Sequence, residues 1–171
     1  MSVAAVILAA GAATRYGAPK QRLLLEGVVD RVSQATSIGE VVVVAGAFEL
    51  DTDARVVECP EWERGAGASL RCGLRALGDD VEAAVVVLAD GPDLAPAAVD
   101  RLVAAWRDSA GEVLAATYGG ARSHPVLLAR SVWDRVPDEG ARALEPVLVA
   151  CDDLPGPGDV DRPEELPDRF R

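Results

Sequence analysis

Val3-Ala4-Ala5-Val6-Ile7-Leu8, followed directly by Ala9-Ala10-Gly11, is the stretch that decides the fold. Its consecutive apolar residues end at small residues and a glycine, a pattern typical of a strand that is buried on both faces. Such strands belong to parallel sheets whose two faces are covered by helices. The stretch therefore predicts an α/β fold in which the first strand runs straight into a tight turn.

Further runs rich in Val and Ile alternate with helical patterns along the rest of the chain. We expect strands over residues 41–44, 55–58, 83–88 and 112–117. We expect helices over about residues 30–37, from an N-cap at Ser69 to residue 77, and from Pro96 to residue 106. Within residues 131–150 we expect one helical turn and then a second helix, with a break near residues 137–140. This alternation predicts a three-layer, Rossmann-like fold: an open, mostly parallel sheet with helices on both faces. Residues 1–171 are expected to form a single domain.

Composition and charge narrow the functional classes. Half of the 171 residues are apolar and only 4% are aromatic, so we expect a core of Val, Leu, Ile and Ala. The net charge of −11 argues against nucleic-acid binding, which depends on clustered Lys and Arg. The apolar start from Met1 to Ala10 lacks the basic residues of a signal peptide, and no run reaches the roughly 18 apolar residues of a membrane span. Neither a nucleic acid nor a membrane is therefore an expected partner.

The three cysteines, Cys59, Cys72 and Cys151, are widely spaced and match neither a metal site nor a disulfide framework. Each is expected to be a small buried hydrophobic residue with a free thiol. Because free thiols are typical of a reducing compartment, the sequence predicts a cytoplasmic location.

The loop from Gly11 to Lys20 has the residues of a phosphate cradle. Small residues let backbone N–H groups approach an anion closely. Arg15 can fork onto two phosphate oxygens, Lys20 offers a mobile point charge, and Pro19 stiffens the loop. The spacing of Gly11, Gly17 and Lys20 fits neither a Walker P-loop nor the dinucleotide fingerprint. The alternative is an ordinary strand-to-loop turn with solvated charges.

The string Leu8-Ala9-Ala10-Gly11-x-x-x-Arg15-x-Gly17-x-Pro19-Lys20 resembles the signature of the nucleotidyltransferases that act on molybdopterin, within the NTP transferase superfamily. It most resembles the molybdenum cofactor cytidylyltransferase branch. Later segments resemble the family pattern in the same order: residues 58–65 with 69–71, 88–92, 124–126, 140–142 and 159–166. The resemblance implies a fold of the nucleotide-diphospho-sugar transferase type, with a nucleotide site formed by Leu8, Ala9, Ala10, Gly11, Arg15, Lys20, Gly65 and Ser69. Ser69 is equally a candidate helix cap.

Asp90 and Asp161 are the candidate metal ligands. Asp90 follows the run of residues 83–88, and at the carboxyl end of a parallel strand it should face the same crevice as the phosphate loop. Mg²⁺ is typically held by one or two carboxylates together with substrate phosphates. Asp161 is the expected second carboxylate, in agreement with the resemblance, and Asp159 is the less favoured partner. The alternatives are a turn or helix cap at Asp90 and an exposed acidic tail at the other two residues.

Nucleotidyl transfer is the chemistry that these residues predict. The terminal phosphate of an acceptor attacks the α-phosphorus of a nucleoside triphosphate, and pyrophosphate leaves. Positioning and charge neutralisation dominate such reactions, which makes Arg15, Lys20 and Asp90 the candidate catalytic residues. An acceptor phosphate is already anionic at pH 7, so no general base is required. His124, the single histidine, is a candidate acceptor contact, with a structural role before Pro125 as the alternative.

The resemblance implies transfer of CMP from CTP to molybdopterin with Mg²⁺ as cofactor, because an alanine at the position of Ala10 goes with cytidylyl transfer in the family. Guanylyl or other nucleotidyl transfer, to molybdopterin or to another phosphorylated small acceptor, is the first alternative. The second is a non-catalytic nucleotide-binding module that serves a molybdoenzyme or its chaperone. The sequence decides neither the acceptor nor the oligomeric state.

Overall fold

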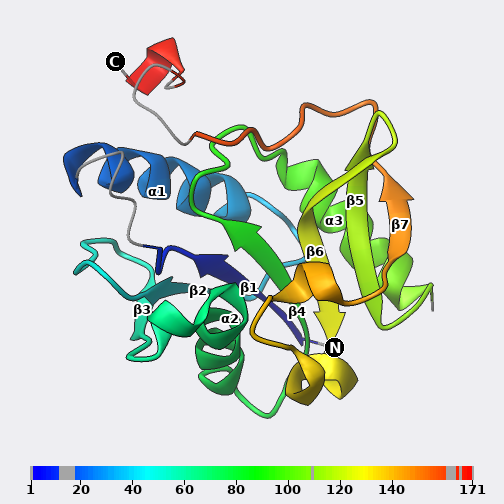
Figure 1. Cartoon of the computed structure of the whole chain (residues 1–171). Coiled ribbons are helices and arrows are strands. Elements are labelled where there is room, and N and C mark those ends of the chain that lie inside the picture. Colours follow the sequence, from blue (N-terminus) through cyan, green and yellow to red (C-terminus); the bar gives the residue numbers. More distant parts are fainter. Residues whose placement is uncertain (1, 12–17, 109, 161–164, 166, 171) are drawn as a thin grey trace.

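Seven strands of the described chain form one open sheet. The computed structural model describes residues 2–11, 18–108, 110–160, 165 and 167–170. The strands are β1 (Ser2–Leu8), β2 (Glu40–Ala45), β3 (Arg55–Glu58), β4 (Val81–Leu88), β5 (Val113–Tyr118), β6 (Ala121–Ala129) and β7 (Val147–Ala150), in the order β3-β2-β1-β4-β6-β5-β7 (Figure 1). The described helices are α1 (Ala18–Ser33), α2 (Ala66–Arg75) and α3 (Pro96–Arg107), with 3₁₀ turns η1 (Trp62–Arg64), η2 (Arg130–Arg135), η3 (Ala141–Ala143) and η5 (Asp168–Phe170). None of these helices is long and apolar enough to cross a lipid bilayer.

The sheet is parallel except at β6. β1 pairs in parallel with β2 and β4, and β2 pairs in parallel with β3. β6 runs antiparallel to both of its neighbours, β4 and β5, and β7 pairs in parallel with β5. The carboxyl ends of β1, β2, β4 and β5 therefore lie at the same edge of the sheet as the beginning of β6.

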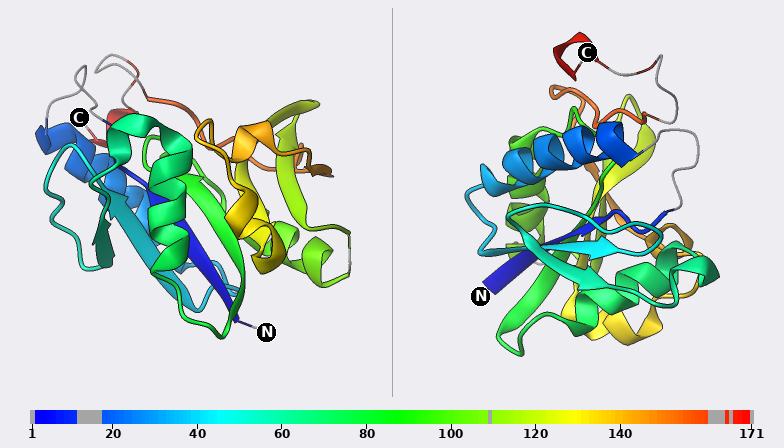
Figure 2. Two further views of the ribbon diagram at one scale, coloured as in Figure 1. Left: turned by 60° about the horizontal axis from the view of Figure 1, so that its bottom comes forward. Right: turned by 90° about the vertical axis from the view of Figure 1, so that its left-hand side faces the viewer.

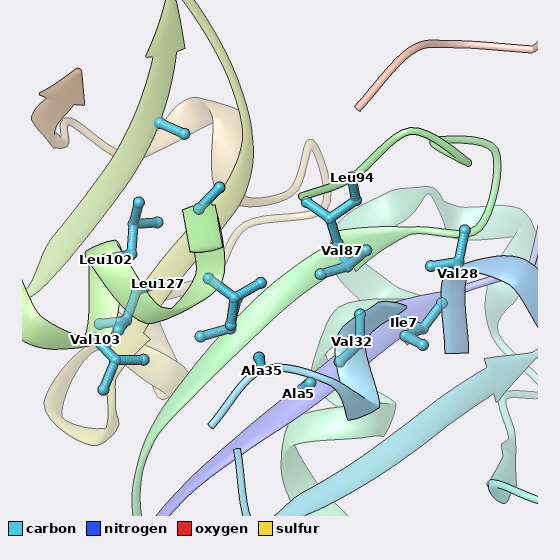
Figure 3. Close-up of a cluster of buried hydrophobic side chains, with 14 of the residues drawn as sticks. Ala5, Ile7, Val28, Val32, Ala35, Val87, Leu94, Leu102, Val103 and Leu127 are labelled. Carbon is cyan, nitrogen blue, oxygen red and sulfur yellow. The ribbon is translucent and has the colours of Figure 1, made fainter. Parts of the chain in front are cut away.

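Two apolar layers bury the two faces of the sheet. Within β1, Ala5 and Ile7 contribute to one layer and Ala4 and Val6 to the other, as the two-residue period of a strand requires. α1 and α3 supply the helical side chains of the first layer, part of which is drawn in Figure 3. α2 and η2 supply those of the second layer, and Figure 2 shows α1 and α2 on opposite sides of the sheet. The fold class predicted from the sequence is confirmed.

The expected strands are present, with bounds that differ by a few residues. Residues 41–44 and 83–88 lie within β2 and β4, residues 55–58 are β3, and residues 112–117 overlap β5. The helix expected from Pro96 is α3, and this proline occupies its first turn, where the missing N–H has no helical acceptor to reach. The Val-rich runs in β4 and β5 are largely buried, whereas the edge strand β3 is only partly buried.

Three helix predictions were wrong. The helix expected over residues 30–37 is the end of α1, which begins at Ala18 and buries residues 24, 25, 28 and 32 at helical spacing. Ser69 lies inside α2, whose N-cap is Gly65. The second helix expected within residues 131–150 is absent from this described segment, where η2 and η3 precede strand β7. Val147 and its β-branched neighbour Val149 pair with β5 instead, because strand pairing there outweighs a weak helical pattern.

The prediction of three free thiols was also wrong. Cys59 and Cys72 form a disulfide that links the residue after β3 to α2, with 5.8 Å between their Cα atoms. Their separation of 13 residues gave no disulfide signal, because η1 and the start of α2 fold back to bring them together. Cys151 is a free, buried cysteine, as expected. The thiol argument for a cytoplasmic location therefore loses its premise.

Candidate functional site

The ends of β1, β2 and β4 are joined by backbone hydrogen bonds. The amide of Ala9 donates to the carbonyl oxygen of Val44 over 3.0 Å, and the amide of Ala89 donates to the carbonyl oxygen of Leu8 over 3.1 Å. The stretch Leu8-Ala9-Ala10, predicted to bind a nucleotide, thus leaves the sheet between the ends of β2 and β4. A ligand at this edge would contact the loops after both β1 and β4.

The proposed phosphate loop begins at this point. Gly11 is exposed, and a Cβ atom added there would meet nothing within 4 Å. Arg15 and the rest of residues 12–17 lie outside the described residues, as does the side chain of Lys20. The backbone of Lys20 lies in the first turn of α1. Because free N–H groups at a helix start favour anions, this end of α1 suits a phosphate-binding loop.

Asp90 follows β4 and lies against the C-terminal segment. Its Oδ1 atom is buried, and its carbonyl oxygen accepts a hydrogen bond from the amide of Val160 over 3.0 Å. Three residues further on, the amide of Asp93 donates to the carbonyl oxygen of Pro157 over 2.9 Å. Residues 157–160 therefore run along the loop after β4.

The second predicted metal ligand, Asp161, lies outside the described residues. It follows Val160 directly in the sequence, so the backbone bond to Asp90 brings the chain to this loop just before Asp161. Asp159 is exposed. Within the described part of the chain, no three His, Cys, Asp or Glu side chains form a ready metal site. A buried carboxylate oxygen on Asp90 nevertheless fits a hard divalent cation that takes its other ligands from phosphates and water.

A cavity of about 740 Å³ opens beside these strand ends. Its apolar lining comes from β1, α2, β4 and β6, through Leu8, Leu70, Val86, Leu88 and Val126. Its ionisable lining residues include Arg64, Arg122, His124, Asp138 and Arg142. Of the residues predicted from the sequence, Leu8, Gly65 and His124 are brought together here, whereas Ser69 is buried inside α2 and is not among the lining residues.

His124 lines the cavity from the beginning of β6. Arg122, Ser123 and Val126 of the same strand also line it. Burial lowers the pKa of His124 to about 4, which leaves its imidazole neutral near pH 7. The hydroxyl of Tyr118 donates to the backbone carbonyl oxygen of His124 over 3.1 Å and fixes this part of β6 against β5.

Two arginines of the cavity were missed by the sequence analysis. The guanidinium of Arg122 donates to the carbonyl oxygens of Ala141, Arg142 and Leu144 over 3.0 to 3.3 Å, and so holds the η3 turn against β6. Arg142 is exposed at the cavity and forms no ion pair with a described carboxylate. β6 itself was not expected, so no local pattern placed Arg122 next to residues 141–144.

Gly65 shapes the α2 side of the cavity. It is the N-cap of α2 and has a φ of +122°, a backbone conformation that residues other than glycine rarely adopt. The amide of Ser69 donates to the carbonyl oxygen of Gly65 over 3.4 Å within the first turn of the helix. Gly65 therefore lines the cavity, whereas Ser69 is buried in the helix behind it; their predicted contact with a nucleotide stays a prediction.

This chain is similar to a curated bifunctional enzyme in sequence and to several solved proteins in structure. The bifunctional enzyme IspD/IspF of Rhizorhabdus wittichii is 33% identical over 157 residues, which cover 84% of this chain. The chain spans only 40% of the length of that curated relative. The solved structure of Rv0371c from Mycobacterium tuberculosis H37Rv is 26% identical with a TM-score of 0.74, and the match covers 96% of this chain and 95% of the other.

A third similarity concerns the fold alone. The 4-diphosphocytidyl-2C-methyl-D-erythritol synthase of Anaerococcus prevotii is 14% identical, with a TM-score of 0.73 over 96% of this chain and 92% of that one.

The sequence model of one protein family, the MobA-like NTP transferase domain, matches residues 5–156, most of the chain. The chain therefore belongs to the MobA-like NTP transferase domain family.

Proposed function

We propose that this chain transfers a nucleoside monophosphate from a nucleoside triphosphate to the phosphate of a small acceptor, with release of pyrophosphate. One observation carries the proposal: the hydrogen bond between Leu8 and Ala89 joins the ends of β1 and β4 beside the large cavity. The loop that begins at Gly11 and the carboxylate of Asp90 then flank one ligand site. Residues 1–171 act in this proposal as one nucleotidyltransferase domain.

The residues divide the work by charge. The backbone of Leu8-Ala9-Ala10-Gly11 cradles the triphosphate, and Arg15 and Lys20 neutralise it. Asp90 and Asp161 hold a divalent cation, Mg²⁺ in this proposal, which neutralises phosphate charge when bound. The acceptor phosphate attacks the α-phosphorus, the bond from that phosphorus to the bridging oxygen breaks, and pyrophosphate leaves with the bonding electrons. No protein group has to take a proton.

The part of the cavity lined by His124 and Arg142 supplies the acceptor site in this proposal, and the part lined by Leu8 and Gly65 borders the nucleotide. The cavity lining combines an apolar surface with the guanidinium of Arg142, which has no carboxylate partner within the described part of the chain. Such a lining suits an acceptor with an extended, weakly polar body and an anionic end. The neutral imidazole of His124 can donate one hydrogen bond and accept another there. Molybdopterin, which has a flat heterocycle and a terminal phosphate, is the acceptor that we propose.

CTP is the proposed nucleotide. A structure of CMP:2-keto-3-deoxy-manno-octonic acid synthetase, 14% identical with a TM-score of 0.66, was determined with CTP. A structure of the Mycobacterium tuberculosis protein, 24% identical with a TM-score of 0.70, contains manganese. These two proteins share the fold of this chain and motivate the choice of CTP and the inclusion of Mn²⁺ in the test. GTP with the same acceptor, or another phosphorylated acceptor, is the alternative.

Pyrophosphate release tests the proposal. The assay combines molybdopterin with CTP, GTP, ATP or UTP, in the presence of Mg²⁺ or Mn²⁺. Release with CTP that needs both the acceptor and the metal is the expected result. Release with GTP alone would replace cytidylyl by guanylyl transfer. Nucleotide binding by calorimetry without any release would contradict the molybdopterin reaction and favour the non-catalytic binding module.

A further inference from the structure

Asp138 joins the two walls of the cavity. One wall is formed by Arg64, Gly65 and Ala66, and the other by residues 138–142. The carboxylate of Asp138 accepts hydrogen bonds from Arg71 over 2.5 Å and from Arg64 over 3.5 Å, so that both arginines come from the first wall and its helix. Each carboxylate oxygen of this residue thus has its own guanidinium partner.

The backbone continues the same connection. The carbonyl oxygen of Asp138 accepts a hydrogen bond from the amide of Gly67 over 2.9 Å. A Cβ atom at Gly67 would lie 1.7 Å from the carbonyl oxygen of Pro137, and one at Gly65 would lie 2.8 Å from that of Asp138. The two walls therefore meet at backbone distance, and only glycines permit this approach.

Arg71 anchors the connection to the body of the protein. Its second nitrogen donates to the carbonyl oxygen of Val136 over 2.8 Å, while its side chain is only 18% exposed. The hydrogen bond from Arg71, with the charge of Arg64 beside it, holds the pKa of Asp138 below its ordinary value. The carboxylate is thus charged at neutral pH and bound to a fixed guanidinium.

We propose that Asp138 is a positioning residue for the acceptor site: it sets the separation of the two cavity walls and thereby the place of Arg142. Arg142 lies four residues after Asp138, and Arg122 holds the carbonyl oxygens of the intervening turn. With Arg64 bound to Asp138 and to Glu61, Arg142 is left to receive the anionic part of the acceptor. The kinetic side of this inference rests on the proposed function.

The test compares Asp138→Asn, Asp138→Glu and the control Asp79→Asn. Asp79 forms a surface ion pair with Arg130 outside the cavity, so its variant loses one ion pair without touching the walls. For Asp138→Asn we expect the KM for the acceptor to rise about tenfold, because the variant loses one charged hydrogen bond. Its kcat should stay within about twofold of the wild-type value. Asp138→Glu keeps the negative charge, so its KM should lie between the values of Asp138→Asn and the wild type. Asp79→Asn should have the wild-type KM. Equal KM values for Asp138→Asn and Asp79→Asn would overturn the proposal.

Hydrogen exchange supplies a readout that needs no activity. The amide of Gly67 should exchange about tenfold faster in Asp138→Asn than in the wild type, while amides in α3 are unchanged. Unchanged exchange at Gly67 would overturn the positioning role even if kinetics changed. Faster exchange in a protein that turns over no nucleotide would support Asp138 and contradict the proposed function. If Asp138→Asn does not fold, Arg64→Ala breaks the connection from the other wall, with the same expected outcomes.

Discussion

The amide nitrogen of Val160 lies 3.0 Å from the carbonyl oxygen of Asp90 and donates a hydrogen bond to it. This bond joins two segments separated by 70 residues of sequence, the loop after β4 and the chain just before Asp161. In the proposed function, both carboxylates hold the same divalent cation.

Removal of either carboxylate should abolish transfer. In Asp90→Asn and Asp161→Asn we expect pyrophosphate release to fall about 100-fold or more, because each loses a charged metal ligand. Asp159→Asn is the matched control, since Asp159 is exposed on the same segment and should retain activity. Measuring the rate against Mg²⁺ concentration separates weaker metal binding from misfolding. Full activity in Asp161→Asn together with loss of activity in Asp159→Asn would show that Asp159, and not Asp161, is the second metal ligand.

Lys20 should react with a nucleotide that carries an aldehyde. It is the only lysine in the sequence, so amine-directed labelling reports on one side chain and the N-terminus. We expect CTP that carries pyridoxal on its terminal phosphate to attach to Lys20 after borohydride reduction, because the proposed phosphate loop holds Lys20 against the triphosphate. Peptide mass spectrometry locates the label, and excess CTP with Mg²⁺ should prevent it. Labelling confined to the N-terminal amine would argue that Lys20 lies away from the nucleotide.

His124 should make stability depend on pH between about 4 and 6.5. Burial lowers its pKa to about 4 in the folded protein, whereas the unfolded chain titrates near the ordinary value of 6.5. Between these values the unfolded state binds more protons, so stability falls as the pH decreases through this window. The difference between wild type and His124→Gln in urea unfolding at pH 7 and pH 4.5 isolates this contribution, which we expect to be about 1 to 3 kcal/mol. Parallel pH profiles for the two proteins would contradict it.

A count of free thiols tests the disulfide between Cys59 and Cys72. Without reductant, the denatured protein should show one reactive thiol, that of Cys151, and three after reduction. Closing a loop with a sequence separation of 13 residues is worth about 3 kcal/mol in the chain-entropy model. Unfolding of Cys72→Ser in urea should therefore show a loss of stability of this order relative to the wild type. Three reactive thiols before reduction would contradict the bond.

The sequence predicted β1 to β5 but neither the antiparallel strand β6 nor the edge strand β7. β6 contains Arg122, Ser123 and His124 before its apolar half, so its first residues show no strand pattern. Arg122, Ser123 and His124 line the cavity instead of the core. His124 was found because it is the only histidine, whereas Arg122 was missed because its partners are backbone carbonyl oxygens 19 to 22 residues away.

Other parts of the site depend on contacts that local patterns do not carry. Ser69 resembled a helix cap because an apolar helical repeat follows it, but α2 already starts at Ala66 with a glycine in the capping position. Asp138 looked like one residue of a loop, and its partners Arg64 and Arg71 lie 74 and 67 residues away in the sequence. The disulfide likewise depends on how η1 turns the chain. The long-range pairing of polar groups, more than the secondary structure, could not be predicted from the sequence.

The reversed direction of β6 has a consequence for how such a protein can diversify. Because β5 and β6 are antiparallel neighbours, a hairpin turn at Gly119 and Gly120 projects from the same edge of the sheet as the phosphate loop. A Cβ atom at either glycine would meet nothing within 4 Å, and the amide of Gly119 donates to the carboxylate of Asp152 over 2.7 Å. Residues inserted there would leave the pairing of β5 with β6 unchanged and, in the proposed function, would lie at the edge of the sheet that binds the substrates. This hairpin is thus a natural place to graft new acceptor specificity, by insertion in the laboratory or in evolution.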